Sequence, residues 1–302
     1  MNEPDGGEIL VVLAAGRARR YGGCKPLAPV GPAGEAVIDL LASDALAAGF
    51  GSIILVIGPA TGPAIRYHVE RTWPSRVDVQ FELQEQPLGT VHAVLRGTEH
   101  VAPDRRVGVA NADDLYGEEA LSLLAGHLRS DDPDEALVAF RLRNTVVGES
   151  PVTRGVCEVD ADHRLTAVAE RRQVMPDTGG RFVSKDGRDP SEIDGDALVS
   201  MNLWGFTPTM REALVRAMAA ARGLSEDTEI LLPEVVGRQL ALAGRGDDTA
   251  TAGSPALRFR VIPAGGRCIG VTHPDDLVPV QEELARAVAA GQRAAQLWGA
   301  VK

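Results

Sequence analysis

The chain has 302 residues, 44% of them hydrophobic and 24% charged, and its formal net charge is −11 at pH 7. This length supports a sizeable buried core, and the negative charge argues against nonspecific binding to nucleic acid or to an anionic membrane. The polar N-terminal segment MNEPDGG is not a signal peptide by composition, and no apolar run approaches the roughly 20 residues that span a bilayer. We interpret the three isolated cysteines as reduced thiols and expect a cytoplasmic protein without nucleic-acid or membrane partners.

The first predicted strand, residues 8–12, is apolar and β-branched and leads directly into the segment LAAGRARRYGGCKPL, residues 13–27. Small residues in this segment allow backbone N–H groups to approach an anion closely, and Arg20 and Lys25 supply positive charge at the same place. The segment is not a GxxxxGKS/T phosphate loop, because Pro26 follows Lys25, and it lacks the GxGxxG pattern of dinucleotide-binding loops. It predicts a phosphate-binding loop of a different kind.

Strand-like and helix-like segments alternate through the first half of the chain. After the first strand, the sequence predicts strands at residues 52–57, 77–83, 106–111 and 135–141, and helices at residues 34–48, 61–71, 89–99 and 118–128. This order predicts a mostly parallel sheet with helices on both faces. Ligands of such sheets bind beyond the carboxyl ends of the strands, so we expect the functional site there.

The second half of the chain shows a different pattern. Strands are predicted at residues 155–159, 165–170, 198–206 and 257–263, and helices at residues 208–221, 228–243 and 274–290. The polar stretch 176–196, rich in Gly and Asp, predicts an exposed loop, a small hairpin or a flap over the site. We find no internal repeat and no clean break between two independent domains.

Two further segments place polar residues where a predicted strand ends. In QEQPLGTVHA, residues 84–93, Gln84 carries an amide that supplies both a donor and an acceptor, as a pyrimidine edge requires. Gly89 and Thr90 begin the helix that follows, although Thr90 taken alone is equally a helix N-cap. The segment therefore predicts a base-binding element.

The segment VANADDLYG, residues 109–117, ends an apolar strand with two carboxylates, Asp113 and Asp114. Adjacent side chains on an extended backbone point in opposite directions, so one Mg²⁺ would rarely bind both directly. We expect Asp113 to be the metal ligand and Asp114 to have a supporting role. Taken alone, the pair also fits a turn before a helix.

Together these segments resemble the signature of the sugar-phosphate nucleotidyltransferases (NDP-sugar pyrophosphorylases), in particular a compact single-domain branch. The resemblance extends from Ile9 to Trp298, although Ala18 replaces the second Gly of the usual GxG. It implies a three-layer α/β/α Rossmann-like fold with a mostly parallel sheet, of the nucleotide-diphospho-sugar transferase type, and a small antiparallel sugar-binding subregion. We expect one domain, with a nucleotide-binding half at about residues 1–150 and a sugar-phosphate-binding half at about residues 151–302.

The resemblance also implies roles for individual residues. The implied catalytic residues are Arg20, Lys25 and Asp113, with the two cations neutralising phosphates and Asp113 holding Mg²⁺. The implied nucleotide-binding residues are Leu13, Ala14, Ala15, Gly16, Gln84, Gly89 and Thr90. The implied sugar-phosphate-binding residues are Gly155, Glu170, Arg171 and Asn202. Where many relatives carry a second metal-binding Asp this chain has Gly270, so we consider Asp276 for that role, although it equally suits the first turn of a helix.

The implied reaction couples an NTP with a sugar 1-phosphate, through Mg²⁺-assisted in-line attack on the α-phosphorus, and releases pyrophosphate. Gln84 favours UTP, followed by dTTP. Two alternatives remain: a transferase for a non-sugar acceptor, such as a polyol phosphate or the molybdenum cofactor, and a catalytically idle regulatory relative that binds an NDP-sugar. Leu297 and Trp298 near the C-terminus indicate either a homo-oligomer interface or a tail docked on the core.

Overall fold

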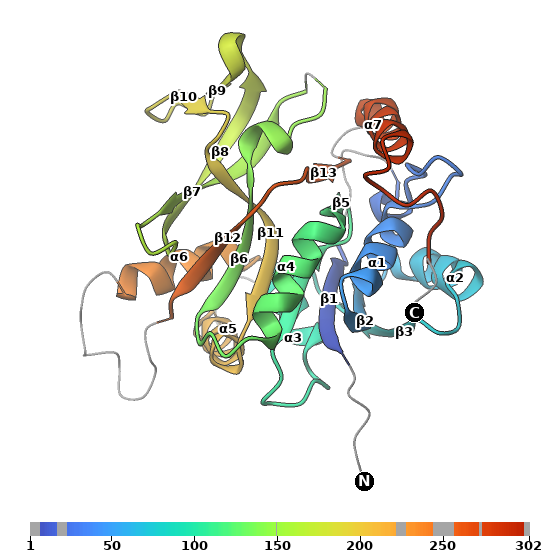
Figure 1. Ribbon diagram of the computed structural model, residues 1–302. Helices are drawn as coiled ribbons and strands as arrows, with labels where there is room; N and C mark the ends of the chain where they lie inside the picture. Colours follow the sequence, from blue (N-terminus) through green and yellow to red (C-terminus); the bar gives the residue numbers. More distant parts are fainter. Residues whose placement is uncertain are drawn as a thin grey trace.

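The computed structural model describes residues 7–16, 23–148, 150–221, 228–243, 257–271 and 274–298. These residues form a mixed sheet of eleven strands with helices on both faces (Figure 1). Its parallel part has the order β4-β1-β2-β3. These strands are β1 (Glu8–Ala14), β2 (Phe50–Ile57), β3 (Asp78–Leu83) and β4 (Val107–Asn111). The predicted three-layer α/β/α architecture is confirmed.

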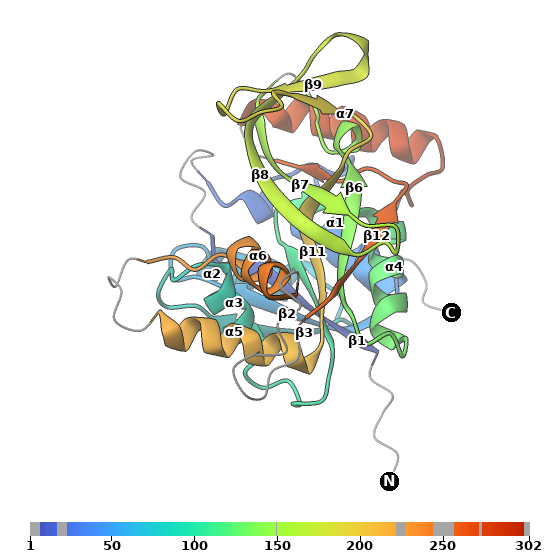
Figure 2. The same cartoon turned by 90° about the vertical axis from the view of Figure 1, so that its left-hand side faces the viewer.

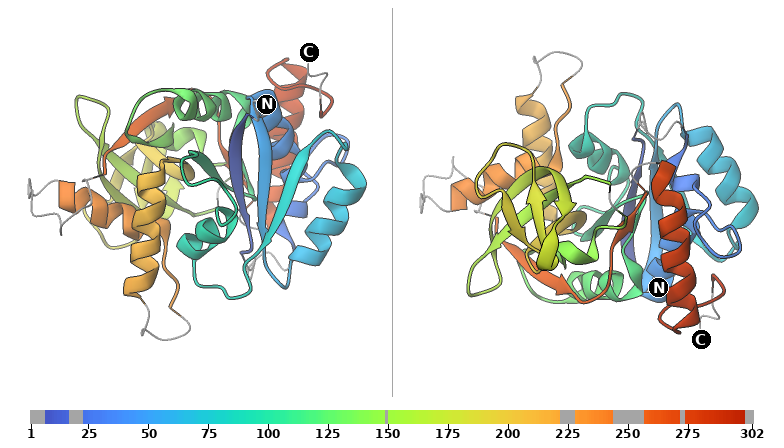
Figure 3. Two further views of the ribbon diagram at one scale, coloured as in Figure 1. Left: turned by 90° about the horizontal axis from the view of Figure 1, so that it is seen from below. Right: turned by 90° about the horizontal axis from the view of Figure 1, so that it is seen from above.

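Side chains of the central strands alternate between two hydrophobic cores. In β1, Leu10 and Val12 belong to one core and Val11 to the other, because successive side chains of a strand point to opposite faces. The first core is covered by α1 (Val37–Ala47), α2 (Gly62–Thr72) and α4 (Gly117–Arg129). The second is covered by α3 (Thr90–Gly97), α5 (Pro208–Ala220) and α6 (Leu232–Ala243). Seen from below, the strands lie between these helix layers (Figure 3).

The rest of the sheet is largely antiparallel. It comprises β6 (Glu135–Arg141), β7 (Val152–Val159), β8 (Leu165–Pro176), β9 (Arg181–Ser184), β10 (Glu192–Asp194), β11 (Leu198–Phe206) and β12 (Phe259–Ala264). Strand β11 pairs antiparallel with β4, β6 and β7. Strands β7–β10 form an arm that rises away from the helix layers (Figure 2). Val174 and Phe182 of the arm belong to a small separate core, to which Leu142 and Val199 outside the arm also contribute.

The C-terminal part covers the base of the predicted phosphate loop. Helix α7 (Leu277–Ala289) packs through Val280 and Leu284 against Ala28, which follows the 3₁₀ turn η1 (Lys25–Leu27). A short antiparallel pair lies beside it, formed by β5 (Asp114–Leu115) and β13 (Ile269–Gly270). The C-terminal tail, residues 290–298, then docks on the core, where the centroids of the Trp298 and Trp73 rings lie 5.5 Å apart. Three further 3₁₀ turns are η2 (Leu142–Asn144), η3 (Thr178–Gly180) and η4 (Pro274–Asp276). None of the helices in the described ranges combines the length and hydropathy of a membrane-spanning segment.

Element boundaries differ from the sequence prediction where backbone geometry or strand pairing decides them. Helix α1 begins at Val37 instead of residue 34, because Gly34 has a φ of 89° and closes a turn with Gly31. Strand β8 continues beyond residue 170 to Pro176, because its last residues pair with β9. The stretch 176–196 folds as the β9–β10 hairpin, one of the arrangements expected for it.

Candidate active site

A pocket of about 560 Å³ lies at the carboxyl ends of β1, β3 and β4. Many of the residues expected to bind substrate line it: Leu13, Ala15, Gly16, Gln84, Gly89, Thr90, Asp113 and Asn202. Ala14 does not, because its side chain is buried in the core while its carbonyl accepts a hydrogen bond from the Thr61 hydroxyl at 3.2 Å. Arg20 falls in residues 17–22, outside the described residues. The structure therefore brings segments far apart in sequence to one edge of the sheet.

Lys25 and Asp113 face each other at this edge. The Lys25 ammonium lies 3.6 Å from Asp113 Oδ2. Lys25 begins the turn η1, which continues into the apolar segment packed beneath α7. Burial raises the pKa of the Asp113 carboxyl, and the Lys25 charge counteracts part of that rise. The pair places one positive and one negative group beside the small-residue turn.

Asp114 is directed away from this pair, toward the short β13 strand. Its Oδ2 accepts a hydrogen bond from Asn111 Nδ2 at 3.0 Å. A side chain at Gly270 would collide with Asp114 Oδ1, so the glycine at this position makes room for the Asp114 carboxylate. Burial and the neighbouring Asp113 carboxylate raise the pKa of Asp114 to about 7, and the hydrogen bond from Asn111 and the Arg154 guanidinium partly counteract them. This hydrogen bond orients the side chain of Asn111, which itself lines the pocket.

The expected base-binding element is fixed by the segment that leads into α6. Gly89 has a φ of 91°, and a side chain there would collide with the backbone of Ile230. The Val91 N–H donates to the Ile230 carbonyl at 3.1 Å, and the Leu232 N–H donates to the Thr90 hydroxyl at 2.8 Å. The start of α3 is thereby held rigidly beside Gln84.

Of the four residues expected at the sugar-phosphate end, the structure brings Asn202 to the pocket. Asn202 has a φ of 58° at the register break of β11, and its Oδ1 accepts a hydrogen bond from Trp204 Nε1 at 3.3 Å. Gly155 lies in β7, paired with Ser200 of β11 and with Glu170 of β8. This placement puts Gly155 one strand away from Asn202.

The charged residues of β8 and η4 are engaged elsewhere. Glu170 is exposed and pairs with Arg172 at 2.7 Å. Arg171 is buried in the arm, where its Nε lies 2.8 Å from Asp186 Oδ2 and its Nη2 donates to the carbonyls of residues 188 and 190. Asp276 is also buried and does not line the pocket. Its negative charge favours the protonated form of the Arg154 guanidinium. The structure does not bring Arg171 or Asp276 to Asp113.

The donor set at the pocket fits a magnesium ion that takes much of its coordination from a substrate. Mg²⁺ prefers oxygen ligands and typically takes one or two protein carboxylates together with water and phosphate oxygens. Asp113 supplies a carboxylate and Asn111 an amide oxygen at the same edge. Within the described ranges, no group of three or more His, Cys, Asp or Glu side chains could hold a metal alone. An ion held by Asp113 and Asn111 would complete its coordination with water and phosphate oxygens.

Five pocket residues were not singled out from the sequence: Pro87, Ala93, Asn111, Glu229 and Leu231. Asn111 is the last residue of β4, so the rule that sites form at carboxyl strand ends could have identified it. Glu229 and Leu231 come from the segment before α6, where no motif signals a site. Their position follows from the hydrogen bonds between Ile230 and the start of α3.

A small-residue turn, a lysine–aspartate pair and an amide at the carboxyl edge of a parallel sheet define a nucleotide-binding α/β protein. The chain belongs to the family of MobA-like NTP transferase domains, whose match extends over residues 10–183. It is therefore a nucleotidyltransferase, and the family expected from the sequence is confirmed.

Solved structures share the fold over nearly the whole chain. The inositol-1-phosphate CTP transferase from T. maritima superimposes with a TM-score of 0.63 at 14% identity, over 94% of this chain and 97% of that one. HddC from Yersinia pseudotuberculosis gives a TM-score of 0.57 at 15% identity, over 91% and 99% of the two chains. No curated protein sequence matches the chain.

Proposed function

We propose that this nucleotidyltransferase couples an NTP, with UTP and then dTTP as first candidates, to a sugar 1-phosphate and releases pyrophosphate. The observation that carries the proposal is the convergence of Asp113, Gln84 and Asn202 on one pocket, with the Lys25 ammonium 3.6 Å from Asp113 Oδ2. The pocket thus offers charged groups for phosphates, an amide for the base and a second amide for the acceptor. We further propose that residues 1–302 act as one domain, since strands from both halves share one sheet.

The proposed reaction requires positioning and charge stabilisation, with no protein nucleophile. A phosphate oxygen of the acceptor attacks the α-phosphorus in line; a new P–O bond forms, and the bond from the α-phosphorus to the bridging oxygen breaks. Lys25, together with Arg20, neutralises the β- and γ-phosphates and then the departing pyrophosphate. Asp113 and Asn111 would hold Mg²⁺, which supplies further positive charge to the reacting phosphates when bound.

Gln84, Gly89 and Thr90 would bind the base and ribose, and Leu13–Gly16 would place backbone N–H groups against the phosphates. Asn202 is the proposed contact for the acceptor. Gly155 on β7 and Glu170 on β8, one and two strands away from β11, are proposed to bind it as well. All three cysteines are free, which suits a cytoplasmic enzyme.

A polyol phosphate is the second candidate acceptor. The buried ion pair of Arg171 with Asp186 removes one of the expected sugar-phosphate contacts from the pocket. The fold is also shared with an inositol-1-phosphate CTP transferase. For this reason the substrate test needs polyol phosphates and CTP beside sugar 1-phosphates and UTP.

The test is a pyrophosphate-release assay over the common NTPs, with sugar 1-phosphates and inositol 1-phosphate as acceptors, with and without Mg²⁺. We expect release with one nucleotide–acceptor pair. Lys25→Ala and Asp113→Ala should each reduce turnover by about 10²-fold or more while circular dichroism stays unchanged. Asp104→Ala, on an exposed segment before β4, serves as the matched control.

Two outcomes would contradict the proposal. Nucleotide binding without release for any pair would indicate an idle relative. Normal turnover in the Asp113→Ala variant would remove the role given to the lysine–aspartate pair.

A further inference from the structure

The amide of Gln84 is held in one orientation. Its Nε2 lies 3.0 Å from the Gly89 carbonyl oxygen and 3.2 Å from His92 Nδ1. A backbone carbonyl can only accept a hydrogen bond, so the Gln84 atom that faces Gly89 must be the nitrogen. The amide nitrogen then carries its second hydrogen toward His92.

His92 must accept that second hydrogen bond through Nδ1, which requires a neutral imidazole with its proton on Nε2. Burial lowers the pKa of His92 and so favours this neutral form, although a hydrogen bond from the ring to the Gln86 backbone opposes the shift. His92 lies in the first turn of α3, the helix whose start is fixed by Ile230. The imidazole is therefore presented to Gln84 by a rigid element.

Both hydrogens of the Gln84 amide thus form hydrogen bonds within the protein, and only its oxygen remains to bind a ligand. Among the described residues no group donates a hydrogen bond to Gln84 Oε1, while Gln84 lines the pocket. A freely rotating amide could turn either its oxygen or its nitrogen toward a base. Here the nitrogen is already used by Gly89 and His92.

We propose that His92 is a positioning residue that sets base discrimination, because it holds Gln84 so that only its oxygen can read the base. The inference rests on the role of Gln84 in the proposed function. An oxygen in this place accepts from a donor on the base and is repelled by an acceptor.

Donors and acceptors on the base edge are inverted between uracil and cytosine, and again between guanine and adenine. Uracil has a ring N–H donor beside a carbonyl, where cytosine has a ring nitrogen acceptor beside an amino group. A fixed oxygen therefore favours one member of each pair, whereas an amide that can flip serves both. Sites that hydrogen-bond a substrate group discriminate strongly against analogues that leave a buried polar group unpaired.

The experiment measures nucleotide Kd by calorimetry, and kcat and KM where turnover is found, for UTP against CTP and for ATP against GTP. His92→Phe keeps a ring of similar size but removes the acceptor, and His92→Asn retains an acceptor near the position of Nδ1. His100→Phe, at an exposed histidine just after α3, is the matched control. Gln84→Ala tests the base contact itself.

We expect the wild-type protein to prefer one member of a pair at least tenfold. His92→Phe should reduce that ratio to less than about threefold, mainly through KM, with kcat little changed. His92→Asn and His100→Phe should keep the wild-type ratio.

A ratio that survives in His92→Phe, or that is lost equally in His92→Asn, would overturn the inference, as would a wild-type protein that does not discriminate. If Gln84→Ala alters neither affinity nor ratio, the assignment of Gln84 to the base fails instead. The two failures are therefore distinguishable.

Discussion

Gly89 shows how one residue can serve both the fold and the site. Its φ of 91° suits glycine, and any side chain would meet the Ile230 backbone. We expect Gly89→Ala to lower the free energy of unfolding by about 2 kcal/mol or more, since left-handed strain and a backbone collision add. Nucleotide affinity should fall with it, because Thr90 would move. Urea unfolding and calorimetry measure the two effects.

Gly126 offers the control for this substitution. It lies within α4, and a side chain there would have nothing within 4 Å. Gly126→Ala should be neutral or stabilising by roughly 0.5–1 kcal/mol, because Ala is the better helix former. If the Gly89 variant unfolds like the Gly126 variant, position 89 does not need glycine.

Single residues of the site were predictable from sequence where a short motif carries them. Lys25, Asp113 and Gln84 stand in local motifs next to strand ends. The structure brings Asp113 and Gln84 to one pocket and places Lys25 beside Asp113. Arg171 also stands in such a motif, but its partner Asp186 lies beyond the neighbouring strand β9, between β9 and β10. Pairing across a hairpin leaves no local signal in the sequence.

At the scale of elements, hydrophobic periodicity predicted the strands and helices that are long enough to show a repeating pattern. The bounds of β6 and β11 agree with the predicted 135–141 and 198–206. The two-residue strands β5 and β13 were not predicted, because two residues show no alternation. They matter nonetheless, since their pairing sets Asp114 against Gly270.

The arm gives a prediction at this scale. The Arg171 guanidinium holds the pKa of Asp186 well below its usual range, and both side chains are over nine-tenths buried. Arg171→Gln would leave the Asp186 carboxylate buried without its cation, which destabilises the arm. We expect faster proteolytic cleavage within residues 176–196 and an unchanged nucleotide Kd, because the core that Val174 and Phe182 join is separate from the two cores that flank the central strands.

Arg172→Gln is the control for the arm, since Arg172 forms an exposed pair with Glu170 and such pairs contribute little. Limited proteolysis followed by mass spectrometry compares the two variants. Equal cleavage rates would show that the buried pair does not hold the arm together. A loss of nucleotide affinity in Arg171→Gln but not in Arg172→Gln would indicate that Arg171 contributes to the substrate site.

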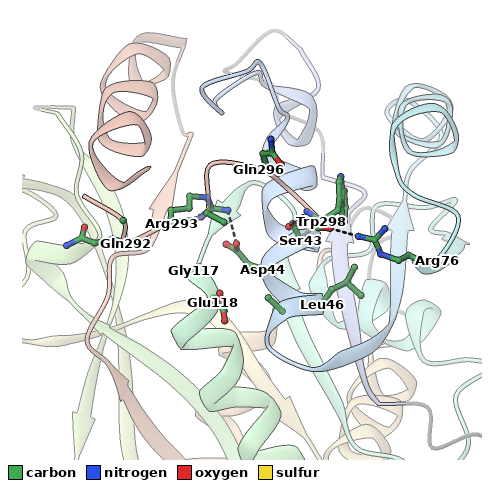
Figure 4. Close-up of a pocket in the computed structure, with 13 residues that line it drawn as sticks. Ser43, Asp44, Leu46, Arg76, Gly117, Glu118, Gln292, Arg293, Gln296 and Trp298 are labelled. Carbon is green, nitrogen blue, oxygen red and sulfur yellow. Dashed lines mark hydrogen bonds and ion pairs between the residues drawn. The ribbon is translucent and has the colours of Figure 1, made fainter. Parts of the chain in front are cut away.

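At the scale of the whole molecule, the C-terminal tail ties distant helices together. A second cavity, of about 580 Å³, lies between α1, the start of α4 and this tail (Figure 4). Arg293 in the tail donates to Asp44 of α1 at 2.8 Å, and the Trp298 N–H donates to the Ser43 hydroxyl at 2.9 Å. Arg76 donates to the Trp298 carbonyl. The tail therefore closes over the same helix that supports the turn bearing Lys25.

The raised pKa of Asp44 predicts that the stability of the protein depends on pH. Its Oδ2 has no hydrogen-bond partner among the described residues, and burial raises its pKa from 3.8 to about 6, with Arg293 lowering it in part. Between pH 3.8 and about pH 6, Asp44 keeps its proton in the folded protein and releases it in the unfolded chain. The stability contributed by Asp44 is therefore fully present below about pH 3.8 and is lost as the pH rises through about 6.

At 1.36 kcal/mol per pH unit, the difference amounts to about 3 kcal/mol. Asp44→Asn removes the titration but keeps an oxygen for Arg293. We expect the free energy of unfolding of the wild type, minus that of Asp44→Asn, to fall by up to this amount between pH 4 and pH 7.5. Urea unfolding at several pH values measures it, with Asp78→Asn, an exposed site on β3, as control. A difference that stays constant over the range would show that Asp44 ionises like an exposed carboxyl and that the tail closes independently of pH.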